Sequence, residues 1–414
     1  MKQELMEKYA ALAIGTGVNV QEGQVVQIHA SVDQYPFVRL LVKEAYARGA
    51  KRVDVEWADQ PVTRMAYENE TLEVLSEVPQ WRREKLQLMT EELPCRLYVL
   101  SEDPDGLAGI DQQKMMKARQ ANARVAKPYR DAIDNKHQWS IVAMPSPEWA
   151  RKVFPDLSEE EAFEKLGDAI LQSVRVTEEN DPAQAWAAHN ATFAAVCEKL
   201  NAYRFTAMRY RSANGTNLEV GLMPESRWQG GGEYTLNGVY YNPNMPTEEV
   251  FTSPWAGKAE GTVVSTMPLS YNSQLIDGFS ITFENGRAVS CQAEQGQALL
   301  EEMLAMDEGA SMIGELALIP FDSPIANTGI LFYETLFDEN ASCHIALGSG
   351  YENTMDGYET RSHEEAQAKG LNDSIIHVDF MIGAADLSII GITEDGREIR
   401  VFIEGNWAPE FAQE

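Results

Sequence analysis

Several features that define whole classes of protein are missing from this sequence of 414 residues. No stretch reaches 18 consecutive apolar residues, so we expect no transmembrane helix. The four cysteines are scattered and form no CxxC pair, which argues against a disulfide framework and favours a reducing cytoplasm. The first residues lack the basic start and apolar block of a signal peptide. These absences together predict a cytoplasmic protein.

Positive charge is also scarce, because 34 Lys and Arg stand against 64 Asp and Glu, a formal net charge of −30. Such a chain repels phosphate backbones, so we expect no nucleic-acid partner. Neither GxGxxG nor GxxxxGK[ST] follows any predicted strand in the first half. A nucleotide-binding role for that half is therefore poorly supported.

The first half alternates strand-like and helix-like segments. Apolar runs at 24–30, 51–59, 95–103 and 139–150 are typical of buried strands, and helical patterns lie between them. This alternation predicts right-handed βαβ units and an α/β N-terminal domain, residues 1–200, with a mostly parallel sheet. Residues 157–203 are expected to be mainly helical.

The second half has a different pattern. Asn-Gly pairs in "NGTNLEVGL" and "FENGRAVSC" and Asp-Gly in "ITEDGREIRVFIEGNW" lie between strand-like runs, and they are tight hairpin signals. We therefore predict a β-rich α+β C-terminal domain, residues 201–414, with a few helices such as 292–308. The boundary is expected near 180–205, without an obvious flexible linker.

Polar residues of one chemical kind interrupt apolar segments of this second domain. The segments are "NPNMPTEEVFTSPW", "SMIGELALIP", "ENASCHIALGSGY" and "IIHVDFMIG", and none contains Lys or Arg. A buried carboxylate without a partner costs several kcal/mol, so these residues need cations from elsewhere. Each one alone is more often a structural residue, but their joint occurrence favours a site. The residues are Glu315, His344, His377 and Asp379, together with one of the adjacent pair Glu248 and Glu249, which would point to opposite faces of a strand.

The spacing of His377 and Asp379 supports this interpretation. Strand alternation places both side chains on one face, with backbones roughly 6.5–7 Å apart, so both can reach one metal ion or two neighbouring ions. Two Glu, two His and one Asp form a mixed N/O donor set that suits Zn²⁺, Mn²⁺ or Co²⁺ and allows a carboxylate to bridge two ions. Two ions held in this way suggest hydrolysis.

The residues leave alternatives open. Another dinuclear hydrolase, an amidase or phosphoesterase, is one, although no HxH occurs and local basic residues for phosphate are lacking. A non-enzymatic binding protein with a structural metal is the other, although such sites are usually closed and tetrahedral, often with cysteines.

Four segments resemble the signatures of the M29 metallopeptidases, the aminopeptidase T and aminopeptidase S group. They are "NMPTEEVFTSP", "GELAL", "LFDENASCHIALGSGY" and "HVDFMIG", and the resemblance runs over essentially the whole chain. It implies a cytoplasmic, metal-dependent aminopeptidase acting on short peptides with a free N-terminus. It also implies a homodimer with enclosed active sites and two divalent ions, Zn, Co, Mn or Mg.

The resemblance also implies roles for single residues. The metal ligands are Glu249, Glu315, His344, His377 and Asp379, and the active-site tyrosine is Tyr351. Glu315 or Glu249 would move the proton from water to the leaving amine, and Tyr351 would stabilise the oxyanion. The first domain would form a wall restricting access and would supply dimer contacts.

Several neighbouring residues carry weaker expectations. Glu248 would face away from Glu249 on a strand, as a surface residue or a neighbour of the ligands. Arg361 is a candidate partner for a ligand carboxylate, and His363 is expected in a solvated loop or helix. The histidines outside these segments, His29, His137 and His189, are expected to have structural roles.

Overall fold

The computed structural model describes residues 1–412. These residues divide into two compact units, 1–189 with 232–247, and 190–231 with the described residues from 248 onwards. The division differs from a single boundary near residue 200, because the segment 232–247 returns to the first unit. Of the described residues, no helix is both long enough and apolar enough to cross a membrane.

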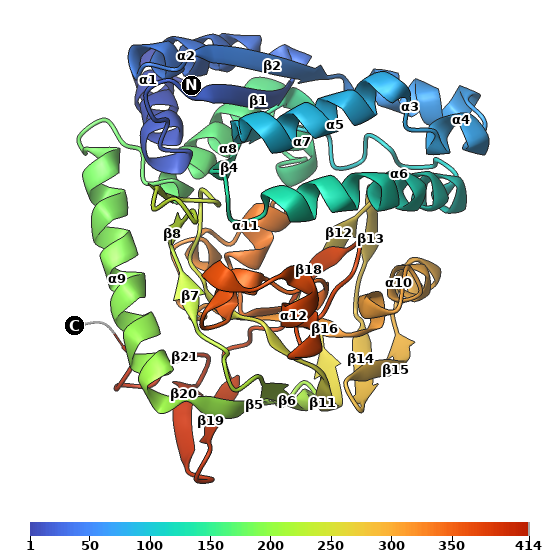
Figure 1. The fold of residues 1–414 in the computed structure, drawn as a ribbon, viewed down its shortest axis with the longest axis vertical. Helices are drawn as coiled ribbons and strands as arrows, with labels where there is room; N and C mark the ends of the chain where they lie inside the picture. The colour runs from blue at the N-terminus through green and yellow to red at the C-terminus, as the bar shows by residue number, and fades with distance from the viewer. Residues whose placement is uncertain (413–414) are drawn as a thin grey trace. The chain divides into compact units, whose positions relative to one another are not determined.

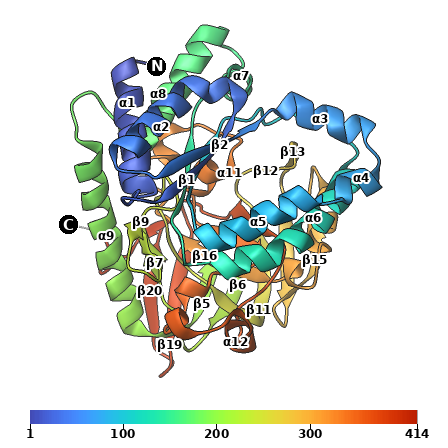
Figure 2. The ribbon, with the colours of Figure 1, turned by 45° about the horizontal axis from the view of Figure 1, so that its top comes forward.

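The first unit contains the predicted parallel sheet, which within the described chain has four strands in the order β2-β1-β3-β4. Helices α1 and α2 lie on one side of it and α5 and α6 on the other (Figure 1, Figure 2). This placement is what right-handed crossovers require when the strand order reverses after β2. The strands are β1 Val25–Ser31, β2 Arg52–Ala58, β3 Cys95–Leu100 and β4 Trp139–Ala143.

The fourth strand is shorter than the predicted 139–150, which is wrong beyond Ala143. Ser146 and the following proline end the extended segment and begin α7 Pro147–Val153. The Ser146 hydroxyl accepts the Trp149 N–H at 3.2 Å, and a proline at the first helical position needs no N–H partner.

The helices of the first unit follow their sequence signals. For example, α8 begins with a capping box in which Ser158 and Glu161 each accept the other's backbone N–H. The predicted helical character of 157–203 is confirmed by α8 and α9, the latter of which crosses the division between the units. These and the other elements are α1 Gln3–Leu12, η1 Ala13–Gly17, η2 Val32–Gln34, α2 Tyr35–Ala47, α3 Gln60–Asn69, α4 Leu72–Ser76, α5 Gln80–Glu92, α6 Gln112–Ile133, α8 Glu159–Ser173, α9 Pro182–Tyr203, β8 Glu233–Tyr234 and β9 Tyr240–Tyr241.

The second unit is antiparallel, as predicted. Its described residues form a larger sheet in the order β15-β14-β11-β6-β5-β19-β20-β21. The predicted Asn-Gly and Asp-Gly turns join β5 to β6, β14 to β15 and β19 to β20. The strands are β5 Phe205–Arg211, β6 Asn217–Leu222, β11 Pro254–Val264, β14 Ser280–Glu284, β15 Arg287–Gln292, β19 Ser388–Thr393, β20 Glu398–Ile403 and β21 Asn406–Trp407.

A second antiparallel sheet of this unit has the order β18-β17-β16-β10-β7. Every residue of β16 and β17 is buried, so this sheet is covered on both faces at its centre. Its strands are β7 Gln229–Gly230, β10 Val250–Thr252, β16 Ile313–Leu318, β17 His344–Gly348 and β18 His377–Met381. The other elements of the unit are β12 Leu269–Tyr271, β13 Gln274–Ile276, α10 Gln297–Leu304, η3 Gly309–Ser311, η4 Ala326–Thr328, α11 Thr335–Glu339, η5 Glu352–Thr354, η6 Tyr358–Thr360 and α12 His363–Ala368.

Candidate metal centre

Strand register brings the predicted ligands to one face of the buried sheet. Glu315 on β16 and Asp379 on β18 both pair with Ala346 of β17, so the two carboxylates flank a methyl group. His377 pairs with Gly348, and His344 lies two residues before Ala346 on the same face. Small residues on β17 thus leave room for the larger side chains of both neighbouring strands.

The two imidazoles are oriented by main-chain carbonyl groups. His377 Nδ1 donates to the Ser349 carbonyl at 2.7 Å. His344 Nδ1 lies 3.0 Å from the Glu339 carbonyl oxygen and 3.1 Å from that of Ser342. A proton on Nδ1 leaves the Nε2 lone pair of each ring free, and both Nε2 atoms face the carboxylates.

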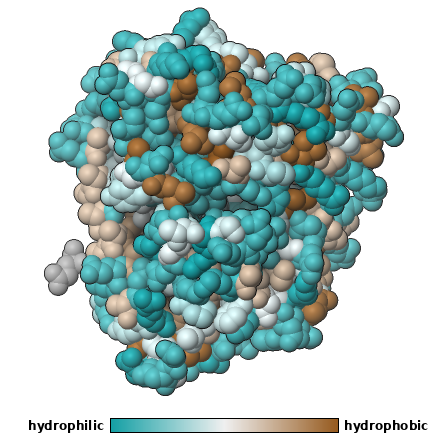
Figure 3. Space-filling view, in the orientation of Figure 1, coloured by the Kyte–Doolittle hydropathy of each residue, from teal (hydrophilic) through white to brown (hydrophobic). Residues whose placement is uncertain are grey.

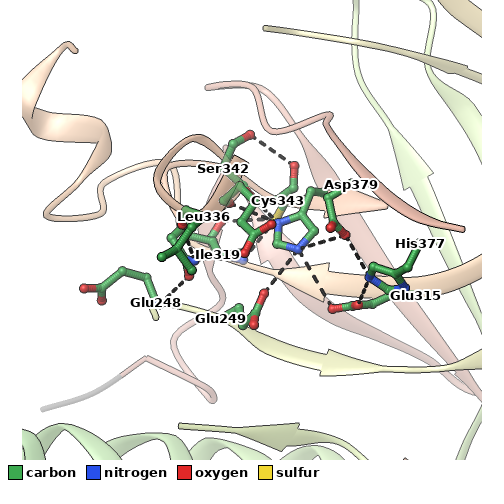
Figure 4. A network of polar contacts seen from close by, with 12 residues as sticks. Glu248, Glu249, Glu315, Ile319, Leu336, Ser342, Cys343, His377 and Asp379 are labelled. Atoms are coloured by element: carbon green, nitrogen blue, oxygen red, sulfur yellow. Dashed lines mark hydrogen bonds and ion pairs between the residues drawn. The ribbon is translucent and has the colours of Figure 1, made fainter. Parts of the chain in front are cut away.

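The carboxylate oxygens gather around these two nitrogens (Figure 4). His344 Nε2 lies 3.2 Å from Glu249 Oε2 and 3.9 Å from Glu315 Oε1. His377 Nε2 lies 3.1 Å from Glu315 Oε2 and 3.4 Å from Asp379 Oδ1. Glu315 therefore directs one oxygen to each histidine. Two overlapping groups result, Glu249 with Glu315 and His344, and Glu315 with His377 and Asp379.

Burial and mutual repulsion perturb the ionisation of the cluster. The pKa of Glu315 is raised to about 7, mainly by burial. The negative charges of Glu249 and Asp379 also raise it, whereas His377 lowers it. Burial lowers the pKa of His344, but the neighbouring carboxylates outweigh it and hold the pKa well above its usual value. The same balance raises the pKa of His377. The cluster thus concentrates negative charge that favours cations.

The donor set fits divalent metal ions. Two imidazole nitrogens and three carboxylates are ligands that Zn²⁺, Co²⁺ and Mn²⁺ accept. Asp379 Oδ1 is buried and accepts no hydrogen bond from any residue in 1–412, which leaves it available as a ligand atom. Glu315 is 3% exposed and His344 1%, so a bound ion would be largely shielded from water.

Tyr351 lies at the edge of the cluster. Its hydroxyl is 3.2 Å from His377 Nε2, and its ring packs edge-on against Phe251. The Tyr351 N–H donates to Ser253 Oγ at 2.8 Å, which fixes the start of the turn that carries it. The residue is 37% exposed, yet loss of solvent around the hydroxyl, together with the nearby carboxylates, raises its pKa well above 10.

The other predicted neighbours lie apart from the cluster. Glu248 points away from it, as expected, but is only 8% exposed, so a surface position is wrong. Arg361 donates to the Asp356 carbonyl at 3.0 Å rather than to a ligand carboxylate. His363, which was expected in a loop or helix, begins helix α12, and its ring lies between Glu352 and Asp373.

Glu339 is a cluster neighbour that sequence reasoning missed. It is 8% exposed, its carboxyl hydrogen-bonds to Asp379, and its carbonyl lies against His344 Nδ1. Burial, then the charges of Asp379 and Glu249, raise its pKa well above the usual value. It ends helix α11, so strand alternation could not identify it. The available signal was an acidic residue five positions before His344 in a segment already singled out.

Comparison with known proteins gives consistent matches over the full length. The profile of the family described as "Thermophilic metalloprotease (M29)" matches residues 2–407. The chain is 44% identical to Aminopeptidase AmpS of Bacillus subtilis (strain 168), over 97% of this chain and 98% of that protein. It is 41% identical to Aminopeptidase 2 of Geobacillus stearothermophilus, over 98% of each. The solved structure of wild-type AmpT from Thermus thermophilus superposes with a TM-score of 0.88 at 40% identity, covering 98% of this chain and 99% of that one.

Proposed function

The chain belongs to the thermophilic metalloprotease (M29) family and is a metallo-aminopeptidase, and from this premise we propose that it removes N-terminal residues from short peptides at a dinuclear metal centre. The observation that carries the proposal is the pair of overlapping ligand groups that share Glu315. One ion would be held by Glu249, Glu315 and His344, and the other by Glu315, His377 and Asp379. Zn, Co, Mn and Mg are the candidate metals.

Two bound divalent ions would supply a water of lowered pKa and a Lewis acid for the scissile carbonyl. The protein groups do the remaining work. Glu315 or Glu249 accepts the proton of the attacking water and delivers it to the leaving amine. The Tyr351 hydroxyl donates to the oxyanion that develops on the carbonyl oxygen. Its position beside His377 at the exposed edge of the cluster supports this assignment.

The proposal includes a homodimer, with the first unit contributing contacts and a wall that limits access. Large apolar side chains at the surface of α3, α4 and α5 support such contacts, because exposed apolar groups often mark interfaces. Val62 is 61% exposed, Met65 59% and Trp81 60%. Figure 3 shows hydrophobic residues among hydrophilic ones in the upper part, where these helices lie in Figure 1.

A cytoplasmic location is the final part of the proposal. The four cysteines, Cys95, Cys197, Cys291 and Cys343, are all free thiols in the structure. Burial raises the pKa of the Cys95 and Cys343 thiols to about 12, so these two remain protonated and unreactive at neutral pH. Free buried thiols are typical of proteins in a reducing compartment.

The test is hydrolysis of leucine and arginine chromogenic amides by the purified protein, after chelation, and after Zn²⁺, Co²⁺ or Mn²⁺ is restored. We expect activity that chelation removes and metal returns, with about two ions bound per chain when the two ligand groups are both filled. Peptides of increasing length, each with a free or acetylated N-terminus, test the substrate class.

Other outcomes would count against the proposal. Turnover of a phosphoester in place of the amides would favour a different dinuclear hydrolase. Binding of a single ion would contradict the dinuclear centre, and unfolding on chelation without any turnover beforehand would indicate a structural metal. Equal hydrolysis of acetylated peptides would contradict recognition of the free N-terminus.

A further inference from the structure

Tyr351 follows a short connection that is rich in glycine. Strand β17 ends at Gly348, and Gly348 and Gly350 flank Ser349 in the segment that leads to the tyrosine. Gly348 has a φ of +105°, a conformation that other residues rarely adopt. Two glycines give this connection little stiffness of its own, and Tyr351 is partly exposed. The proposed role of its hydroxyl requires a fixed position beside His377, so contacts from elsewhere in the chain have to hold the residue.

Two buried hydroxyl groups hold the main chain of Tyr351. Its N–H donates to Ser253 Oγ at 2.8 Å, and its carbonyl oxygen accepts from Thr354 Oγ1 at 2.6 Å. The Ser253 N–H in turn donates to Thr354 Oγ1 at 3.3 Å, which closes a ring of hydrogen bonds through the three residues. Ser253 and Thr354 are fully buried, so water has little access to replace a hydroxyl that is lost.

The turn is shaped to allow this ring of hydrogen bonds. A Cβ atom at position 350 would lie 2.9 Å from Ser253 Oγ, closer than Cβ atoms approach other heavy atoms. Gly350 therefore lets the hydroxyl come within hydrogen-bond distance of the next N–H. Tyr351 also immediately precedes the 3₁₀ turn η5, in which the Thr354 N–H donates to the Tyr351 carbonyl at 3.2 Å. The side chain and the main chain of Thr354 thus hold the same carbonyl group.

Ser253 connects the tyrosine to a strand of the metal centre. It directly follows β10, which begins after Glu249, and its carbonyl oxygen accepts from Ser226 Oγ at 3.2 Å. Phe251 of the same strand packs edge-on against the Tyr351 ring, with ring centroids 5.7 Å apart. The segment that follows Glu249 therefore contacts Tyr351 twice, at its main chain through Ser253 and at its ring through Phe251.

We propose that Ser253 is a positioning residue for the reaction, which holds Tyr351 so that its hydroxyl lies 3.2 Å from His377 Nε2. The inference rests on the proposed function, in which this hydroxyl donates to the developing oxyanion. Ser253 acts through the main chain of Tyr351, with Thr354 as the second contact. Preorganised donors stabilise a transition state because they need no reorientation during the reaction. Loss of the Ser253 hydroxyl should therefore lower kcat and leave the binding of substrate and metal unchanged.

The experiment is a kinetic double-mutant cycle on a leucine chromogenic amide, with the protein loaded with whichever of Zn²⁺, Co²⁺ or Mn²⁺ restores turnover. The variants are Ser253→Ala, Tyr351→Phe and the double variant. The control is Thr252→Val, which removes a hydroxyl from the adjacent, fully buried residue; that hydroxyl donates to the Arg227 carbonyl at 2.9 Å. Thr354→Val and Thr354→Ser form a second pair, in which only the valine variant loses the hydroxyl, and this pair carries the same cycle if Ser253→Ala does not fold.

We expect Ser253→Ala to lower kcat about tenfold, as loss of a buried hydrogen bond does, with KM and metal content close to those of the parent. In the Tyr351→Phe background the same change should alter kcat by less than about twofold, because the hydroxyl that Ser253 positions is already absent. Thr354→Val should also lower kcat, whereas Thr354→Ser and Thr252→Val should keep it.

A second measurement does not depend on turnover. Hydrogen exchange in the metal-free protein, followed by mass spectrometry of peptides that span 349–354, reports how firmly the main chain of this turn is held. Ser253→Ala and Thr354→Val should speed exchange in this segment. Thr252→Val should leave the exchange unchanged.

Three results would overturn the inference. An equal loss of kcat from Ser253→Ala with and without the Tyr351 hydroxyl would mean that Ser253 supports the fold and not the tyrosine. Parent-like kcat and exchange in Ser253→Ala, beside a large effect of Tyr351→Phe, would show that the tyrosine needs no such support and would leave the proposed function intact. An unchanged kcat in Tyr351→Phe would remove the proposed role of the tyrosine itself, and the inference with it.

Discussion

The two units use histidine in opposite ways. The sequence has six histidines, and each unit contains three of them. In the first unit, burial lowers the pKa of His29, His137 and His189 to about 4, so these rings are neutral at pH 7. In the second unit, His344 and His377 also lose solvent, yet carboxylates on neighbouring strands raise their pKa values well above normal.

The partners explain the contrast. His137 Nδ1 donates to the Ile133 carbonyl, and His189 has the Thr247 carbonyl on one nitrogen and Arg175 on the other. Neutral carbonyl groups and a cationic guanidinium do little to stabilise a protonated imidazole, so the pKa values of these two rings stay low. The rings of the metal centre face several carboxylates instead. Burial lowers the pKa of every one of these rings, and only the several carboxylates around His344 and His377 outweigh it. The single Glu56 carboxylate, 3.6 Å from His29 Nδ1, does not.

The third histidine of the second unit, His363, differs from both groups. Its Nδ1 lies 2.5 Å from Glu352 Oε1 and its Nε2 3.2 Å from Asp373 Oδ1. Each nitrogen of this ring thus lies against a single carboxylate, whereas Nε2 of His377 faces two, those of Glu315 and Asp379. At His377, by contrast, the Ser349 carbonyl accepts from Nδ1 and orients the ring so that Nε2 faces the carboxylates.

The variant His377→Ala should have the largest effect on activity. The variant removes one nitrogen ligand from a centre that supplies several kcal/mol of transition-state stabilisation, so we expect activity to fall roughly a thousandfold. Metal content after gel filtration, measured by elemental analysis, should fall as well. His363→Ala is the matched control and should keep its metal; equal metal loss in both variants would contradict the distinction between the two clusters.

Tyr351→Phe should have the next largest effect. It removes a hydroxyl beside His377 and leaves the ligands in place, so we expect kcat to fall about a hundredfold, as for loss of one oxyanion donor. KM and metal content should stay close to those of the parent protein. Steady-state kinetics with metal analysis checks this, and loss of metal together with kcat would instead assign Tyr351 a role in holding the site.

Acid should weaken the first unit through its neutral histidines. The folded pKa of His137, about 4, lies below the ordinary 6.5, so the unfolded chain binds the proton first. Stability is therefore lost as pH falls from 6.5 towards 4, by about 1.4 kcal/mol per pH unit for this group. His137→Gln should flatten the pH dependence of the unfolding free energy by that amount between about pH 6 and pH 5. Parallel curves for parent and variant would show that His137 does not titrate as described.

The smallest effect is expected from His363→Gln. The amide can hold one of the two carboxylates but carries no charge, so the link between Glu352 and Asp373 is weakened. A half-exposed ion pair contributes little, so we expect the melting temperature to fall by only a few degrees. Scanning calorimetry of the metal-loaded protein measures the shift. A higher melting temperature for the variant would mean that the contacts of the His363 ring with the two carboxylates destabilise the folded protein.

Local patterns predicted much of this fold. Strand and helix alternation identified the parallel sheet, and Asn-Gly and Asp-Gly pairs located hairpins such as Asn285-Gly286, because both signals are fixed by nearby residues. The predicted strand 139–150 is too long, because Ser146 and Pro147 carry the signal for the start of a helix. The return of 232–247 to the first unit depends on long-range packing, which no local pattern encodes.

The site shows the same limit. Strand period placed His377 and Asp379 side by side, and their closest atoms are 3.4 Å apart. Glu315 and His344 could be singled out because each interrupts an apolar segment, and both lie on strands. It missed Glu339, which approaches from the end of a helix, and the burial of Glu248. Contacts between different kinds of element follow from tertiary packing rather than from periodicity.

The alanine between the two carboxylates matters when activity is inferred for a distant relative from its sequence. Ala346 is the only spacer that register places between Glu315 and Asp379 in the described sheet. A valine or leucine arising there would force the carboxylates apart while leaving all five ligands intact in the sequence. A distant relative could lose its activity through this one substitution, although its sequence would still contain all five ligands. Transfer of function between remote sequences should therefore check the small residue at this position as well as the ligands.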